Sequence, residues 1–542
     1  MSEAVKTPLE MFYHWERTAP ERIYLRQAKA GQWIDYSWSQ VGQRVRRIAG
    51  FIASRNLPEQ SKIGLWAANC ADWFMIDFAI WMSGHVSVPL FSGQDVKAAR
   101  YILDHVECPL IFLGAFDQSD RVDQAVAAGV TRVAIQGCAV PCDFSLGQVV
   151  ADAEPVTGSP LQGPDQTFTI IYTSGSTGSP KGVMHAHRTP GEVAPGIIKA
   201  LRQEHQARYF SYLPLAHIAE RVLVEMCSLY SDASVAFSEG LARFTDELRA
   251  IQPTCFFSVP RLWTKFKESV EAKIAPATLA HLNEQQKAAI RQQLGLDAGG
   301  FYITGSAPCR RDVHQWFLDL GVILRDAYGA TEHFVNGCIW HHDDSPIPGC
   351  VGTPVAKGEF RISPQGEILF RGPGMMQGYY KEPEKTAQAI VDGWYHVGDS
   401  GRIDADGNLY VTGRMSDVFK TSKGKFVDPL PLEGELVKLA ALGQLCVFGQ
   451  GLDQPVLVAN LSEQGRHLKR DEVEAQLIAA LDRLNETLPA YSLVKQALVV
   501  QEDWRVDNGL MTPTMKIRRK QVEEYYRDRL DSLPADAVIT FE

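Results

Sequence analysis

The stretch YTSGSTGSPKG, from Tyr172 to Gly182, places three glycines, several hydroxyl residues and one lysine close together. The preceding residues, TFTII, are β-branched and aromatic, so they predict a strand that leads into this stretch. Glycine lets backbone N–H groups point into a loop, and the hydroxyls and the lysine add donors and charge, which suits a phosphate. The spacing is neither a Walker A nor a GxGxxG motif, and the loop alone is equally compatible with a plain surface turn.

Chain length and charge exclude several classes of protein. The chain has 542 residues, too many for one compact domain, so we expect two or more. The formal net charge of −10 argues against a broad nucleic-acid footprint. The ten cysteines include no CxxC pair and no zinc spacing, so we expect reduced thiols in a cytoplasmic protein. The opening MSEAVKTPLE lacks the apolar core of a signal peptide.

The apolar patterns predict an α/β fold. Short runs such as CPLIFLG alternate with helical patterns such as AARYILDHV, which is typical of parallel sheets flanked by helices. The apolar stretch Trp73–Phe91 is interrupted by polar residues, glycine and proline, so it predicts a buried helix and a strand rather than a membrane span. Beyond about residue 355, short strands between glycines and aspartates indicate hairpins and a β-barrel-like subdomain. We expect a large N-terminal domain, residues 1–413, and a small mobile α+β domain, residues 414–542.

Six further segments follow the glycine loop in order. They are YLPLAHIAER (Tyr212–Arg221), ITGSAP (Ile303–Pro308), DAYGATEH (Asp326–His333), GWYHVGDSG (Gly393–Gly401), GRMSDVFKTSKGKF (Gly413–Phe426) and LMTPTMKIRR (Leu510–Arg519). With the loop they resemble the adenylate-forming superfamily of acyl-CoA synthetases, luciferases and peptide-synthetase adenylation domains. The resemblance extends over nearly the whole chain. One glycine loop is weak evidence, whereas seven ordered motifs are specific.

The resemblance implies a reaction in two halves that uses ATP, Mg²⁺ and coenzyme A. A carboxylate attacks the α-phosphate of ATP and gives an acyl-adenylate and pyrophosphate. The thiol of coenzyme A then displaces AMP. Because the first half brings an anion to a polyanion, it requires oriented donors, cations and a metal.

The resemblance also assigns the nucleotide site. Thr331 would contact the α-phosphate and Glu332 would hold Mg²⁺, for which a carboxylate oxygen is a suitable ligand. Asp399 and Arg414 would fix the ribose hydroxyls, and Tyr328 would stack on the adenine. The other nucleotide-binding residues are Thr173, Ser174, Gly175, Ser176, Thr177, Gly178 and Lys181 in the loop, Gly305, Ser306, Ala307 and Pro308 in the adenine turn, and Asp326, Gly329 and Ala330 around Tyr328.

The C-terminal motifs imply a domain that alternates between two positions. Lys516 resembles the lysine that reaches the site during adenylation and stabilises the transition state as a point charge. After rotation about a hinge near residues 414–416, the loop KTSKGKF would replace it. There Lys420 would assist thioester formation and Gly424 would let the pantetheine arm pass close to the backbone. The family usually has Asp or Lys at the hinge, where this chain has Ser416.

The substrate is expected to be a fatty acid. The segments LPLAHIAER and PTCFFSVPRLWTKF resemble long-chain fatty acid–CoA ligases, in which His217 would lie between the acyl tunnel and the nucleotide. An apolar pocket distinguishes one methylene by only about 1–3 kcal/mol, so chain length is not predicted. The alternatives are an aryl or other carboxylate–CoA ligase, an acyl-AMP ligase that loads a carrier protein, and a non-catalytic relative that binds acyl groups or nucleotides. The complete set of site residues argues against the last alternative, and Ser416 favours it.

The expected partners are small molecules, namely a fatty acid, ATP and coenzyme A, with no nucleic acid. The resemblance implies a cytoplasmic enzyme that is a monomer or homodimer. Peripheral contact with the inner membrane is left open.

Overall fold

The structure, a computed structural model of the chain, describes residues 5–117, 119–173, 180–203, 205–279, 281–512, 516–534 and 537–542. The chain forms two compact units. Unit 1 comprises Met1–Arg361, Leu369–His396 and Asp404–Leu409, and unit 2 comprises Ile362–Ile368, Val397–Ile403 and Tyr410–Glu542. The domain boundary and hinge expected at residues 414–416 stay a prediction.

Unit 1 contains an eight-stranded sheet in the order β19-β9-β8-β4-β3-β5-β6-β7. The strands from β3 to β8 run parallel to their neighbours, and β9 pairs antiparallel with β8. Their bounds are β3 (Lys62–Trp66), β4 (Val86–Leu90), β5 (Leu110–Leu113), β6 (Thr131–Ala134), β7 (Phe144–Ser145), β8 (Thr167–Thr173), β9 (Lys181–Ala186) and β19 (Gly378–Tyr379). The strand predicted before the glycine loop is β8.

A nine-stranded sheet of unit 1 has the order β16-β15-β14-β13-β12-β10-β11-β1-β2. Its central strands, from β14 to β1, are parallel. The bounds are β1 (Ile23–Lys29), β2 (Gln32–Ser37), β10 (His205–Ser211), β11 (Asp232–Phe237), β12 (Cys255–Ser258), β13 (Phe301–Gly305), β14 (Leu324–Tyr328), β15 (Cys338–Ile339) and β16 (Thr353–Pro354). Because parallel strands share one carboxyl edge, loops that follow them meet there.

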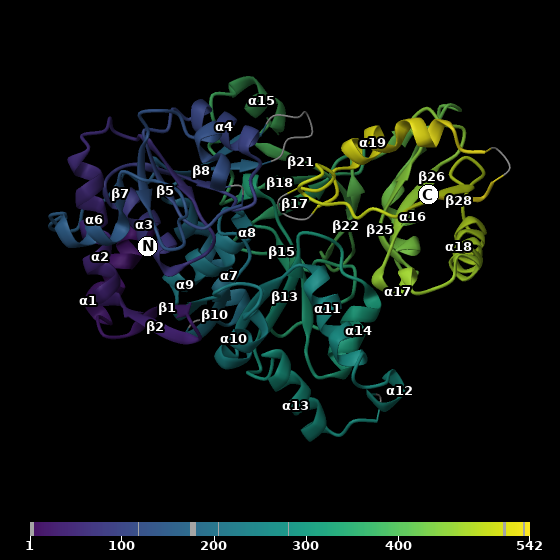
Figure 1. Cartoon of the computed structure of the whole chain (residues 1–542), viewed down its shortest axis with the longest axis horizontal. Helices are drawn as coiled ribbons and strands as arrows, with labels where there is room; N and C mark the ends of the chain where they lie inside the picture. Colours follow the sequence, from purple (N-terminus) through teal and green to yellow (C-terminus); the bar gives the residue numbers. More distant parts are fainter. Residues whose placement is uncertain are drawn as a thin grey trace. The chain divides into compact units, whose positions relative to one another are not determined.

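The helices of unit 1 connect and flank these strands (Figure 1). They are α1 (Pro8–Thr18), α2 (Trp38–Ser54), α3 (Ala71–Met82), α4 (Val96–His105), α5 (Val122–Ala125), α6 (Leu146–Asp152), α7 (Thr189–Leu201), α8 (Ile218–Glu220), α9 (Cys227–Tyr230), α10 (Phe244–Ile251), α11 (Pro260–Glu271), α12 (Pro276–Leu279), α13 (Glu284–Leu294), α14 (Arg311–Asp319) and α15 (Pro383–Ala389). A π-helical turn, Arg221–Met226, joins α8 to α9, and Ser119–Arg121 and Thr331–His333 form 3₁₀ turns.

Helix α3 is the most deeply buried of the long helices. Every residue except Asp72 is buried, including Trp73, Phe74 and Trp81. Strand β4 follows it directly, so the helix and strand predicted from Trp73–Phe91 are confirmed. Within the described ranges, no helix combines the length and the apolar composition needed to cross a bilayer.

The short strands after residue 355 form smaller sheets. One five-stranded sheet has the order β17-β18-β21-β20, with β22 paired to β21. Its strands are β17 (Glu359–Ile362), β18 (Glu367–Arg371), β20 (Ile390–Val391), β21 (Trp394–Ile403) and β22 (Leu409–Arg414). A two-stranded hairpin follows, with β23 (Phe419–Lys420) and β24 (Phe426–Val427).

Unit 2 has its own four-stranded sheet, in the order β25-β26-β27-β28. The strands are β25 (Leu442–Phe448), β26 (Val456–Leu461), β27 (Gln496–Val500) and β28 (Ile539–Phe541). Its helices are α16 (Pro429–Leu436), α17 (Glu463–Arg466), α18 (Arg470–Asn485) and α19 (Arg519–Asp531). Leu477, Leu481 and Leu484 lie on the buried face of α18 and pack with residues of this sheet. The fold class, a large α/β domain with parallel sheets and a smaller α+β domain, is confirmed.

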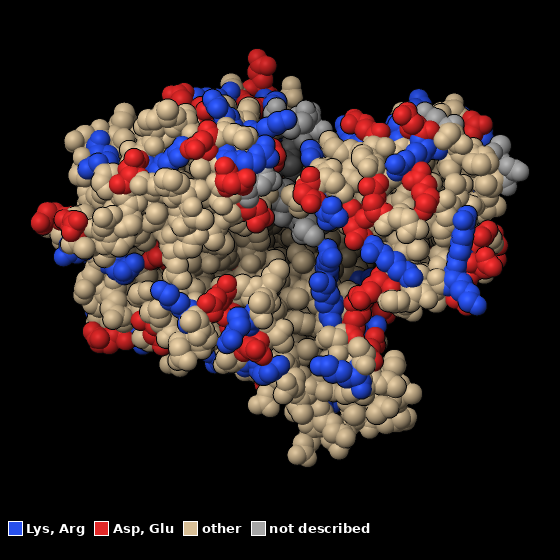
Figure 2. Space-filling model, in the orientation of Figure 1, with Lys and Arg blue, Asp and Glu red and all other residues tan. Residues whose placement is uncertain are grey.

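Charged side chains of both signs are interspersed on the face seen in Figure 2. This mixing fits the modest excess of 64 acidic over 54 basic residues. A surface that mixes both signs has no large field of a single sign.

Candidate active site

The glycine loop connects two antiparallel strands. Thr173, the last residue of β8, pairs with Lys181, the first residue of β9. The predicted phosphate-binding residues Ser174, Gly175, Ser176, Thr177 and Gly178 lie outside the described residues. The Nζ of Lys181 lies 5.0 Å from the centre of the Tyr379 ring, a distance at which a cation–π contact is favourable.

Tyr379 also contacts Glu332. Its hydroxyl donates a hydrogen bond of 3.1 Å to Oε1 of Glu332, while the backbone carbonyl of Glu332 accepts from the N–H of Met376 at 2.7 Å. Burial, and then the charge of Glu332, raise the pKa of Tyr379, so the phenol stays protonated and donates. Glu332 itself is only partly buried. The structure therefore brings together the lysine of the loop and the acid of YGATE through one tyrosine.

Two buried histidines hold the backbone around Thr331. The Nε2 of His185 donates to the carbonyl of Thr331 at 2.7 Å, and Nε2 of His333 accepts from the N–H of Ala330 at 3.0 Å. Burial lowers the pKa of His185 to about 4 and that of His333 to about 3. Both rings are neutral at physiological pH, so they fix this turn without adding charge beside it.

Sequence reasoning missed both histidines. A histidine next to apolar residues is usually a core residue, and nothing in the neighbouring letters tells which backbone group it will meet. For His185, the available signal was its place in the apolar run VMHA, residues 183–186, where it lies on the same face of the strand as Val183.

The predicted adenine turn follows β13. Gly305 pairs with Ala327 on β14, and a Cβ on Gly305 would lie 2.9 Å from the carbonyl oxygen of Ala327, so only glycine fits there. Ser306 has a left-handed backbone, with φ +66°, and Ser306, Ala307 and Pro308 are exposed. The strand register thus sets the adenine turn beside the segment that carries Tyr328.

Asp326 is buried next to this turn and forms an ion pair. Its Oδ2 lies 3.0 Å from Nε2 of His314 on α14, and both side chains are less than a tenth exposed. Burial lowers the pKa of His314, but its interactions with Asp326 and Cys309 outweigh this effect and raise the pKa to about 10. Cys309 directly follows Pro308. His314 is therefore a charged group that contacts both segments of the predicted adenine site.

His217 forms the N-cap of α8. Its Nδ1 accepts from the N–H of Ala219 at 3.2 Å, and its ring centre lies 6.4 Å from that of Phe91. The nearby Glu220 is buried and accepts from the hydroxyl of Ser211 and the N–H of Tyr212. Burial raises the pKa of Glu220 to about 8.

In unit 2, Asp399 and Arg414, which the motifs predict at the ribose, form an ion pair with each other. The Nε of Arg414 lies 3.1 Å from Oδ1 of Asp399, and the Asp399 side chain is 9% exposed while that of Arg414 is 57% exposed. The N–H of Met415 donates to the carbonyl of Gly398, which holds β21 and the segment after β22 together at this point. Ser416 is exposed, and its hydroxyl donates to Asp417 at 3.2 Å.

The remaining predicted residues of unit 2 are Lys516, Lys420 and Gly424. Lys516 is exposed, its carbonyl accepts from the N–H of Thr512, and its own N–H donates to the Thr512 hydroxyl. An isolated β-bridge joins Met511 to Ile517. Lys420 lies on β23, where its Nζ is 5.5 Å from the ring centre of Phe426, and Gly424 has φ +75° at the tip.

The fold and the two family models identify an AMP-binding enzyme. The chain belongs to the AMP-binding enzyme family, whose model matches residues 12–380, and residues 416–537 match the model of the AMP-binding enzyme C-terminal domain. Among curated proteins, it is 25% identical to a fatty acyl-CoA synthetase B of Dictyostelium discoideum, over 93% of this chain and 85% of that protein. It is also 25% identical to a long-chain-fatty-acid–CoA ligase of Mycobacterium bovis, over 96% of each.

Solved structures support the same fold. ATP-bound MatB from Rhodopseudomonas palustris superposes with a TM-score of 0.79 at 21% identity, covering 97% of this chain and 100% of that one. An anthranilate CoA ligase in complex with anthranoyl-AMP superposes with a TM-score of 0.80 at 19% identity, covering 97% and 98%.

Proposed function

We propose that the protein is an ATP-dependent fatty acid–CoA ligase. The carboxylate of the acid attacks the α-phosphate of ATP, pyrophosphate leaves, and the thiol of coenzyme A then displaces AMP to give the thioester. The observation that carries this proposal is the alignment of fatty acyl-CoA ligases along nearly the whole chain, at about 25% identity. The complete set of motif residues supports it.

Glu332 and Lys181 are the residues proposed to meet the phosphates. Glu332 has a carboxylate oxygen held by Tyr379 and a partly exposed side chain, a donor set that fits the Mg²⁺ that neutralises the phosphates of ATP. Lys181 would add charge at the end of the loop, and Thr331 would contact the α-phosphate. The neutral histidines under this turn keep its carbonyl and N–H groups in place.

Asp399 and Arg414 are proposed to hold the ribose. Asp399 is buried and its position is fixed by the arginine, so its carboxylate is oriented before a vicinal diol arrives. A preorganised acceptor avoids the cost of ordering the group on binding. The adenine would lie on the turn Gly305–Pro308 against Tyr328.

Lys516 is proposed to act only in the first half-reaction. Its ammonium would offset the charge that develops between carboxylate and α-phosphate. Lys420 and Gly424 would serve the second half-reaction after the C-terminal domain rotates. His217 would separate the acyl chain from the nucleotide.

The test is pyrophosphate release with ATP and Mg²⁺ across a panel of fatty, aromatic and short-chain acids, with and without coenzyme A. Release that requires a fatty acid, with acyl-CoA and AMP formed only when coenzyme A is present, is the expected result. Release only with aromatic or short-chain acids would refute the fatty acid assignment. Release without any thioester would refute the coenzyme A step and point to a carrier-protein acceptor.

A matched pair of variants ties the activity to the proposed site. Lys516→Ala should abolish most of the release, while Lys520→Ala, which removes an exposed lysine four residues further on, should not. Equal activity of both variants would contradict the assignment of Lys516.

A further inference from the structure

Cys138 and Cys142 lie in contact, far along the chain from every residue assigned above. Their sulfur atoms are 3.8 Å apart, and both thiols are directed at the carbonyl oxygen of Val140, at 3.6 Å each. The segment between them, AVP, has no further polar side chain. Each sulfur therefore has the other sulfur as its nearest reactive neighbour.

The strand pairing explains why these sulfurs meet. Strands β6 and β7 are parallel neighbours, and only residues 135–143 connect them, so the chain must reverse within a short loop. The loop is fixed at both ends, because the N–H of Asp143 donates to the carbonyl of Arg132 and the N–H of Arg132 donates to the Asp143 carboxylate. The N–H of Cys138 donates to the carbonyl of Ile135. The two thiols are thus held at the turn.

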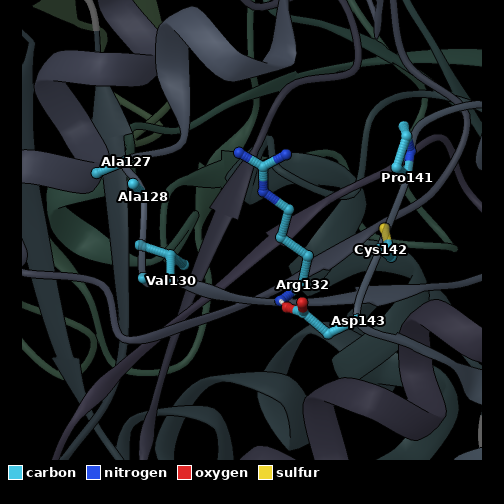
Figure 3. Close-up of a pocket in the computed structure, with 8 residues that line it drawn as sticks. Ala127, Ala128, Val130, Arg132, Pro141, Cys142 and Asp143 are labelled. Carbon is cyan, nitrogen blue, oxygen red and sulfur yellow. Dashed lines mark hydrogen bonds between the residues drawn. The ribbon is translucent and has the colours of Figure 1, made fainter.

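The same two cysteines are also the accessible ones. Of the ten cysteines, eight are buried, and only Cys138 and Cys142 are partly exposed. A pocket of about 300 Å³ reaches this loop and is lined by Cys142, Arg132 and Ala127 among others. Figure 3 shows Cys142 and Pro141 across this pocket from Ala127, Ala128 and Val130, with Arg132 between them. A small reagent can therefore approach the pair from solvent.

We propose that Cys138 and Cys142 form a reactive dithiol that closes to an internal disulfide by exchange with a low-molecular-weight disulfide such as oxidised glutathione. One cysteine sulfur attacks the reagent and forms a mixed disulfide, and half of the reagent leaves as a thiol. The second cysteine sulfur then attacks the first and expels the other half. The two protein thiols lose two electrons and two protons, and the reagent gains them as two free thiols.

The charges around the pair set the order of attack. Burial, and then the charge and hydrogen bond of Cys138, raise the pKa of Cys142 to about 12, with Asp143 adding to the rise and Arg132 opposing it. Cys142 therefore keeps its proton in the reduced pair, and we assign it the second attack. Once Cys138 is in a mixed disulfide, Cys138 no longer contributes to the rise in the pKa of Cys142, and Cys142 completes the exchange.

The experiment counts thiols in the native full-length protein before and after treatment with oxidised glutathione. A chromogenic thiol reagent should detect two of the ten thiols in the native state. After treatment it should detect none, and the mass of the intact chain should fall by two hydrogen atoms. Peptide mapping should join Cys138 to Cys142.

Three variants make the result specific. Cys142→Ser and Cys138→Ser should each trap one glutathione on the remaining cysteine, with no internal bond. Cys70→Ser is the matched control, because Cys70 is buried at the N-cap of α3, a position where serine is favoured, and it should behave as the wild type. Fatty acid-dependent pyrophosphate release checks that each variant is folded.

Two outcomes would overturn the proposal. One is that the treated wild type carries two separate glutathiones with no internal bond, because that would show that the sulfurs do not meet. The other is that buried cysteines react with the thiol reagent as fast as this pair. In that case the number of thiols detected in the native protein would fall no more in Cys138→Ser and Cys142→Ser than in Cys70→Ser.

Discussion

His314 should carry a positive charge far above the pH at which histidines usually lose it. Burial acts against the charged ring, but Asp326 and Cys309 outweigh burial and raise the pKa to about 10, from an ordinary value near 6.5. In four other buried histidines, His85, His185, His187 and His333, burial is not outweighed and lowers the pKa. Burial lowers the pKa of His185 and of His187 to about 4 and that of His333 to about 3. The protein thus contains buried histidines of two opposite kinds.

The consequence for stability follows from the direction of the shift. Each pKa unit corresponds to about 1.4 kcal/mol, so the charged pair is worth at most about 5 kcal/mol. Because the pKa is raised on folding, this stabilisation is fully present below about pH 6.5 and is lost as the pH rises through about 10. His314→Gln should therefore be destabilising at neutral pH and nearly neutral above pH 10.

The direct assay is an NMR titration of histidine labelled at Cε1. The resonance that is absent from the His314→Gln spectrum should keep its imidazolium shift up to about pH 9. In the same titration, the resonances of His185, His187 and His333 should remain neutral down to about pH 5. The reasoning would be refuted if the His314 resonance titrated near the ordinary histidine value of about 6.5, because the ion pair with Asp326 would then contribute nothing.

Three further predictions concern the proposed site. Lys516→Ala should lower the rate of adenylate formation by about 10²-fold or more and leave thioester formation from preformed acyl-adenylate largely intact, so equal loss in both single-turnover assays would contradict the two-position model. Tyr379→Phe removes the hydrogen bond to Glu332 and should raise the Mg²⁺ concentration needed for half-maximal pyrophosphate release several-fold, whereas Tyr380→Phe should leave it unchanged. Ser306→Gly should raise the free energy of unfolding of unit 1 by about 1 kcal/mol, because a left-handed backbone is strained for serine. A lower thermal midpoint of the variant would show that the contacts of the Ser306 side chain stabilise unit 1 by more than this strain destabilises it.

The sequence predicted the elements that carry chemistry better than the contacts that hold them. Strand β8 follows from the β-branched and aromatic residues of TFTII, and helix α3 with strand β4 follows from the interrupted apolar stretch Trp73–Phe91. The motifs also named Asp399 and Arg414, which form an ion pair, and their role at the ribose stays a prediction. These features depend on a few neighbouring letters and on the order of the motifs.

The support of the site could not be predicted in the same way. His185 reaches the carbonyl of Thr331 across 146 positions of sequence, and His314 reaches Asp326 only because α14 packs on β14. A lone histidine in an apolar context gives no indication of such a partner. The left-handed backbone of Ser306 likewise depends on how β13 ends. A glycine at this position would have indicated a left-handed backbone, but the chain has serine there.

Arg221, the last residue of LPLAHIAER, shows how such distant contacts connect the motifs. Its side chain is fully buried, forms ion pairs with Asp77 on α3 and with Glu225, and donates to the hydroxyl of Thr169 on β8 at 3.0 Å. Burial raises the pKa of Asp77 and of Glu225, while the charge of Arg221 lowers both. A single buried cation thereby links the segment that carries His217 to the strand that leads into the glycine loop. Removing it would leave buried carboxyl groups without a cation, so the two motifs depend on Arg221 for their relative position although it need not touch a substrate.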